Sequence, residues 1–174
     1  MRVAQLMLIV MSGLALAGCP KKQTTLPDAS NQPAQSSAET GAATDSSVGQ
    51  GTADANQKLL EAAKQTGTII YFDYDRAEIK PEFVAIVAAH AKYLNSASSN
   101  KVRLEGHSDE RGSREYNIGL GERRAQAVRR ALMLQGVTEA QITTVSYGEE
   151  RPAVQGSDEA AYAKNRRVEL VYGR

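Results

Sequence analysis

The sequence predicts an α+β fold, a two-layer sandwich in which helices lie on one face of a mixed sheet in the order β-α-β-α-β-(α)-β. The first observation is a period of two over residues 102–107, which is typical of a strand with one covered face. The second is the recurrence of apolar residues at helical spacing, between residues 81 and 94 and again between 120 and 132. The third is length, because roughly 110 residues after position 67 are enough to bury a core without disulfides.

The chain begins with the layout of a secretory signal peptide. One early charge, Arg2, precedes an apolar run from Val3 to Leu16 that is too short for a typical membrane-spanning helix. The run ends in Leu-Ala-Gly before Cys19, the only cysteine of the chain. With no second cysteine to pair with, Cys19 is either a lone cysteine near an ordinary cleavage site or a lipidation site.

The Leu-Ala-Gly-Cys ending resembles a bacterial lipobox. We therefore predict a lipoprotein signal peptide over residues 1–18 and an acylated Cys19. Two or more acyl chains give stable membrane attachment. Pro20 stands where an aspartate would be the inner-membrane retention signal of enterobacterial lipoproteins, so the resemblance implies an outer-membrane anchor with the domain in the periplasm.

Residues 20–57 have the composition of a linker. Leu26 and Val48 are their only large aliphatic residues, and all nine aromatic residues of the chain lie at or after Tyr71. Such a segment cannot bury enough surface to offset its chain entropy, so we expect a disordered linker with an average span of roughly 35 Å. A short helix over 54–65 then leads into the folded domain, which we place at 58–174 with its core from about residue 67.

The remaining elements follow from the two hydrophobic periods and from end signals. Pro81 suits the first turn of a helix, Ser113 is a good N-cap, and Gly136 suits a helix C-terminus. The sequence therefore predicts strands over 68–72, 101–107, 142–147 and 167–172. It predicts helices over 81–94, 113–135 and 158–164. His90 lies on the apolar stripe of the first of these helices and is expected to be a histidine of the core edge.

The long helix after Ser113 has an arginine on its apolar side. At about 100° per residue, Leu120, Val128 and Leu132 share one arc with Arg124, whereas the other arginines between 123 and 130 point away from it. A guanidinium on an apolar face must be paired or must await an anion, because burying it alone is costly. Both interpretations stay open: a structural ion pair, most simply with Asp109, or an anion site with Arg124 as its floor.

The same region carries Gly-His-Ser-Asp-Glu-Arg-Gly at 106–112, Tyr-Asn at 116–117 and Leu-Gly-Glu-Arg-Arg-Ala at 120–125. Together with Tyr-Phe-Asp-Tyr-Asp at 71–75, Ser-Tyr-Gly at 146–148 and Asn-Arg-Arg at 165–167, these motifs resemble OmpA-like peptidoglycan-binding domains. Within that family they are most similar to the peptidoglycan-associated lipoproteins, or Pal, of Tol-Pal systems. The resemblance covers roughly residues 67 to 172. Ser108 stands where the family often has Thr, and Gly121 where the wider group often has Ser.

The resemblance implies a non-catalytic tether between the outer membrane and peptidoglycan, with meso-diaminopimelate of the stem peptide as ligand. Arg124 would offer a planar fork to a carboxylate, and Asp109 would take the ammonium group or orient its neighbours. The family match also assigns pocket positions to Tyr74, Asp75, Arg111, Asn117 and Leu120. A TolB-like partner follows from the resemblance alone. The competing class is a protein-interaction module that keeps an OmpA-like fold without binding the wall.

Other classes of function find little support in the sequence. A net charge of +1 gives no reason to expect nucleic acid as a partner. His107, Ser108 and Asp109 contain the residue types of a catalytic triad, but consecutive strand residues point to opposite faces. Glu105, His107 and Asp109 could share a face, yet no second histidine is placed to complete a metal site. We therefore expect no enzyme activity, metal or cofactor.

The lipidation site generates the first prediction. The full-length protein should sediment with outer membranes, whereas Cys19→Ser should appear in the soluble periplasmic fraction, because the acyl chains would supply most of the membrane affinity. Cell fractionation followed by immunoblotting measures the distribution. Cys19→Ser that stays in the membrane pellet would contradict acylation as the main anchor.

Overall fold

The computed structural model describes residues 47–173, and of residues 47–50 the backbone alone. The predicted signal peptide, Cys19 and most of the predicted linker therefore lie outside the described residues. Within residues 47–173, no helix is both long enough and apolar enough to span a membrane.

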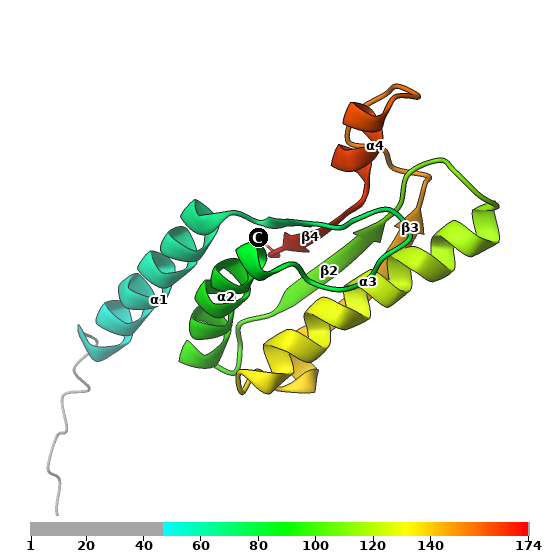
Figure 1. Ribbon diagram of the computed structural model, residues 1–174. Helices are drawn as coiled ribbons and strands as arrows, with labels where there is room; N and C mark the ends of the chain where they lie inside the picture. Colours follow the sequence, from blue (N-terminus) through cyan, green and yellow to red (C-terminus); the bar gives the residue numbers. More distant parts are fainter. Residues whose placement is uncertain (1–46, 174) are drawn as a thin grey trace, which may run out of the picture. The chain divides into compact units, whose positions relative to one another are not determined.

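Four strands form one mixed sheet (Figure 1). Its strands are β1 (Ile69–Tyr71), β2 (Val102–His107), β3 (Ile142–Gly148) and β4 (Arg167–Val171), in the spatial order β1-β4-β2-β3. β2 and β3 run parallel, whereas β4 is antiparallel to both β1 and β2. A parallel pair requires a long crossover connection, which the helix between β2 and β3 supplies.

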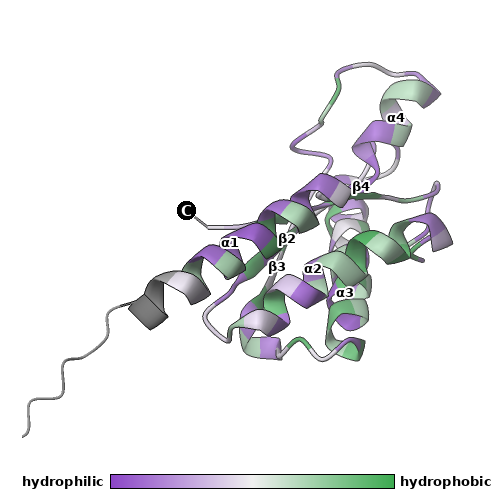
Figure 2. Ribbon diagram, turned by 90° about the vertical axis from the view of Figure 1, so that its left-hand side faces the viewer, coloured by the Kyte–Doolittle hydropathy of each residue, from purple (hydrophilic) through white to green (hydrophobic). Residues whose placement is uncertain are grey.

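The helices form the second layer and confirm the predicted two-layer α+β fold. They are α1 (Ser47–Thr66), α2 (Val84–Ser96), α3 (Arg114–Leu134) and α4 (Glu159–Asn165), with short 3₁₀ turns at Pro81–Phe83 and Glu139–Gln141. α3 packs on the sheet beside α2, and α1 packs along α2 (Figure 1). Polar and apolar residues alternate along α1, as expected for a helix that is packed on one side (Figure 2).

The first helix starts earlier than predicted. α1 begins at Ser47 rather than near Asp54, so the expected disorder of residues 47–57 is wrong. Leu59 and Leu60 pack against the core and Ala63 is fully buried, which fixes the C-terminal half of the helix. Once a helix is nucleated, each further residue adds a hydrogen bond at little cost, so a polar segment without core residues can continue it.

The core lies between the sheet and α2 and α3. Its buried side chains are Ile70, Phe72, Val87, Leu94, Val102, Leu104, Val128, Leu132, Val168 and Leu170. His90 is completely buried among them rather than at the core edge, with one ring nitrogen 2.8 Å from the Gly67 carbonyl and the other 2.6 Å from the Tyr172 hydroxyl. Both nitrogens thus have partners, as a structural histidine requires.

The period of two along β2 predicted that one face of the sheet is exposed to solvent. In the structure, most of the β2 residues on that face are buried. Along β2 only Arg103 is exposed, whereas Glu105 and His107 are buried. Arg103 pairs with Glu105 along the strand, and the Tyr147 ring lies beside the His107 ring. Long neighbouring side chains therefore bury two polar positions that a pattern based on backbone period alone assigns to solvent.

α3 approaches β2 closely at a pair of glycines. A Cβ at Gly121 would overlap the Ser146 hydroxyl and lie 2.9 Å from the carbonyl oxygen of Gly106. The Ser146 hydroxyl itself donates to the Ile118 carbonyl at 2.7 Å. The absence of both glycine side chains therefore allows α3 to lie directly on the end of β2, where the candidate site is built.

This contact predicts opposite effects for two glycines of the same helix. Gly121→Ala should lower the free energy of unfolding by roughly 1–3 kcal/mol, because backbone and Ser146 must move. Gly119→Ala should raise it by about 0.5–1 kcal/mol, because a Cβ there meets no backbone and alanine favours the helix. Urea denaturation measures both, and equal effects would contradict the proposed close packing at Gly121.

Candidate functional site

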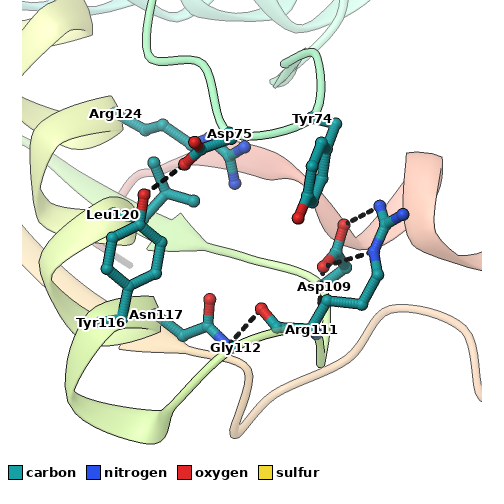
Figure 3. A pocket seen from close by; sticks show the side chains of 9 residues that line it. All are labelled: Tyr74, Asp75, Asp109, Arg111, Gly112, Tyr116, Asn117, Leu120 and Arg124. Atoms are coloured by element: carbon teal, nitrogen blue, oxygen red, sulfur yellow. Dashed lines mark hydrogen bonds and ion pairs between the residues drawn. The ribbon is translucent and has the colours of Figure 1, made fainter.

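A cavity of about 180 Å³ lies where β2 ends and α3 begins (Figure 3). The loop after β1, the loop after β2 and the first turns of α3 wall it. Its lining residues are Tyr74, Asp75, Asp109, Arg111, Gly112, Tyr116, Asn117, Leu120 and Arg124. The structure thus brings together all seven pocket residues expected from the resemblance, and their role in binding remains a prediction.

The rim depends on two residues with left-handed backbone. Gly112 has φ +110°, and Asp75 has φ +54°, a region that aspartate tolerates better than most residues. Ser113 then caps α3 as predicted, accepting a hydrogen bond from the Tyr116 backbone N–H at 3.2 Å. The Tyr116 hydroxyl donates to the Asp75 carboxylate, so α3 and the loop after β1 are joined across the cavity (Figure 3).

Asp109 is a buried carboxylate with four hydrogen-bond donors. Oδ1 accepts from the backbone N–H and the Nε of Arg111, at 3.1 and 3.2 Å. Oδ2 accepts from Nη2 of Arg111 at 2.6 Å and from Nη1 of Arg166 at 3.3 Å. Burial acts to raise the pKa of Asp109, but these hydrogen bonds from Arg111 and Arg166 outweigh it, so the pKa is lowered and the group is a carboxylate at neutral pH.

Arg124 is fully buried, and of its two open interpretations the direct ion pair with Asp109 is not formed among the described residues. In the described part of the chain Asp109 pairs with Arg111 and Arg166 instead. Arg124 donates to three backbone carbonyls: Nε to Arg76 at 2.8 Å, Nη1 to His107 at 2.8 Å and Nη2 to Asp73 at 3.0 Å. The guanidinium therefore joins the loop after β1 to the end of β2, where the second loop of the cavity wall begins.

The buried guanidinium keeps both its charge and part of its donor capacity. Burial lowers the pKa of Arg124 to about 10, with the nearby Asp109 charge opposing the shift, so the side chain stays a cation at neutral pH. A guanidinium has five N–H donors, of which three are used by the carbonyls. The other two have no acceptor among the described residues, and Arg124 is one of the residues that line the cavity.

Arg111 lies at the rim between two aromatic rings. Its guanidinium carbon is 4.1 Å from the centre of the Tyr74 ring and 4.4 Å from that of Tyr162. Its Nη1 also lies 3.5 Å from a Glu159 carboxylate oxygen. The side chain is 34% exposed, so it forms the boundary between the cavity and solvent.

Three residues that support the site were missed as functional positions: Glu159, Tyr162 and Arg166. Arg166 donates to the Phe72 carbonyl at 3.1 Å and to Glu159 at 2.7 Å, besides Asp109. Arg166 lies between the end of α4 and the first residue of β4, and the one signal in the sequence is its place in the Asn-Arg-Arg motif at 165–167. Nothing in the local pattern identifies its partners, which lie up to 94 residues away.

Among residues 47–173, no three or more His, Cys, Asp or Glu side chains gather as a metal site would require. His107 is buried, and its Nε2 lies 3.9 Å from a Glu169 carboxylate oxygen. Burial, aided by Arg167, lowers the pKa of His107 to about 4, so the ring is neutral at pH 7. The cavity instead combines two carboxylates, Asp75 and Asp109, with two guanidinium groups, an arrangement suited to a zwitterion.

The network around Asp109 predicts a pH-dependent loss of stability. Asp109→Asn should lower the free energy of unfolding by roughly 1.5–3 kcal/mol at neutral pH, because it removes the buried anion that Arg111 and Arg166 share and leaves Arg166 with the more exposed Glu159 alone. Since the folded-state pKa lies below the ordinary value of 3.8, the carboxylate stabilises the fold above that value and loses this effect as pH falls through the folded-state pKa. Urea titrations of both proteins should therefore converge in acid, and a constant difference at every pH would contradict this explanation.

A sequence model of the OmpA family matches residues 71–166, over half of the chain. The peptidoglycan-associated lipoprotein of Pseudomonas putida is 53% identical over 133 residues, which are 75% of this chain and 80% of the relative. That of Pseudomonas aeruginosa is 56% identical over 110 residues, 63% of this chain and 65% of the relative.

A solved structure gives the same assignment. The crystal structure of the peptidoglycan-associated lipoprotein from Burkholderia pseudomallei shares 46% identity and a TM-score of 0.60, covering 61% of this chain and 90% of that one. The relatives' names denote a lipoprotein and no catalysed reaction, in agreement with the predicted non-catalytic class. The chain therefore belongs to the OmpA family, and its C-terminal domain is of the peptidoglycan-associated lipoprotein type.

Proposed function

We propose that this domain binds peptidoglycan non-covalently through the diaminopimelate of the stem peptide. Acyl chains on Cys19 would hold the other end of the chain in the outer membrane, so the protein would tether that membrane to the cell wall. The relatives' names support the association with peptidoglycan, and the lipobox supports the anchor. A TolB-like partner and a role in a Tol-Pal system follow from the resemblance.

The observation that carries the proposal is the pairing of charges inside a small cavity. The free end of diaminopimelate presents an ammonium and a carboxylate on one carbon. The cavity offers Asp75 and Asp109 for the ammonium, and Arg111 and Arg124 for the carboxylate. Its volume of about 180 Å³ is below the roughly 300–1,000 Å³ of pockets for larger ligands, which favours an amino-acid head group over a sugar.

The carboxylate and the ammonium of the ligand would contact protein groups that differ in their exposure to solvent. Arg124 forms the floor and has two N–H donors left for a carboxylate, a planar match that a lysine cannot reproduce. Asp75 lies at the rim, where its carboxylate accepts from the Tyr116 hydroxyl. Leu120 supplies an apolar wall for the methylene chain of diaminopimelate.

The test is sedimentation of the full-length protein with purified, protein-free peptidoglycan. Asp75→Asn should weaken binding about tenfold or more, because the loss of a charge-assisted hydrogen bond costs roughly 1.5–3 kcal/mol. Asparagine tolerates the left-handed backbone of residue 75, so the fold should survive, which circular dichroism verifies.

Asp73→Asn is the matched control. It makes the same change two residues earlier in the same loop, but the Asp73 side chain is exposed, pairs with Lys80 and lies outside the cavity. It should bind like the wild type. Equal losses in the two variants would contradict the site, and a wild type that does not sediment would favour the protein-interaction module.

A further inference from the structure

The carboxylate of Asp109 has no vacant acceptor position in the free protein. A carboxylate offers about four lone-pair sites, and Asp109 receives four donors, two on each oxygen. Three of the four come from Arg111. A ligand ammonium can therefore reach Asp109 only if one of these donors leaves.

The donor that can leave is the side chain of Arg111. Arg166 is buried and is held in addition by the Phe72 carbonyl and Glu159. Arg111, in contrast, is one-third exposed at the mouth of the cavity. Its guanidinium can shift between Tyr74 and Tyr162, whose faces would stabilise the cation on either side of its present position.

We propose that Arg111 is a specificity-determining residue that exchanges partners when a ligand binds, an inference that rests on the proposed function. The ligand ammonium takes the position of the Arg111 side chain on Asp109. The freed guanidinium then pairs with the ligand carboxylate from the rim, opposite Arg124 on the floor. The site thus accepts head groups that carry an ammonium and a carboxylate together.

A ligand that carries an ammonium group but no neighbouring carboxylate could make only the first of these two contacts. It would displace Arg111 from Asp109 without supplying a new anion. The freed guanidinium would then have only Glu159, which already accepts from Arg166. Arg111 therefore penalises ligands such as a lysine side chain, in which the carboxylate beside the ammonium is missing.

The test uses two stem tripeptides, L-Ala-γ-D-Glu-meso-diaminopimelate and L-Ala-γ-D-Glu-L-Lys. They differ only in the carboxylate beside the side-chain ammonium. Calorimetric titration of the full-length protein in detergent micelles gives both dissociation constants. The wild type should prefer the diaminopimelate peptide at least tenfold. Arg111→Ala should lose most of this preference, by weakening diaminopimelate binding while sparing the lysine peptide.

Arg114→Ala is the matched control, because it removes an arginine three residues later that pairs with Glu150 outside the cavity. It should keep the preference of the wild type. An Arg111→Ala variant that keeps this preference, or that weakens both peptides equally, overturns the inference and leaves the proposed function standing. A wild type that binds neither peptide overturns the proposed function, and the inference with it.

A second measurement needs no variant at residue 111. In the wild type, the Arg111 Nε–H resonance should shift when the diaminopimelate peptide binds, because its hydrogen bond to Asp109 opens. The Arg166 Nε–H, which donates to the Phe72 carbonyl, should shift little. An unmoved Arg111 resonance at saturation overturns the exchange.

Discussion

The site depends on one buried cation that is hydrogen-bonded without being neutralised. Arg124 donates to the carbonyls of Asp73 and Arg76, in the loop that carries Asp75, and of His107, which ends β2 just before the loop that carries Asp109. One side chain of α3 therefore fixes both loops relative to each other. The carbonyl groups accept from three of its five N–H donors but carry no formal charge, so they do not neutralise the Arg124 cation. A direct ion pair with Asp109 would have cancelled that charge.

The two carboxylates of the cavity consequently differ in character. Asp109 is buried and shared between Arg111 and Arg166, whereas Asp75 lies at the rim on a left-handed backbone. Asp109 thus belongs to the framework until a ligand displaces Arg111, and Asp75 is available from the start. The proposed tether would need reversible but selective attachment, and this division would provide selectivity at the rim while the floor stays rigid.

The sequence alone predicted most of the secondary structure, because hydrophobic period and end signals are local. Ser113 as N-cap, the glycine after α3 and the four strands all follow from such signals. The start of α1 and the burial of Glu105 and His107 could not be predicted from local signals, because each depends on residues that are close in space but distant in the sequence. For the same reason the sequence could not decide between the two interpretations of Arg124: its three acceptors are backbone carbonyls, and backbone carries no sequence signal. Of the seven pocket residues, Arg124 and its neighbour Asp109 were singled out by helical spacing, whereas the other five came from family motifs.

The most direct test of the central claim is a crystal structure of the protein with the diaminopimelate tripeptide. The ligand carboxylate should lie within hydrogen-bond distance of the Arg124 guanidinium, and the ammonium on the side of Asp75 and Asp109. The three carbonyl contacts of Arg124 should be retained. A ligand bound outside this cavity, or one whose ammonium points toward Arg124, would contradict the account.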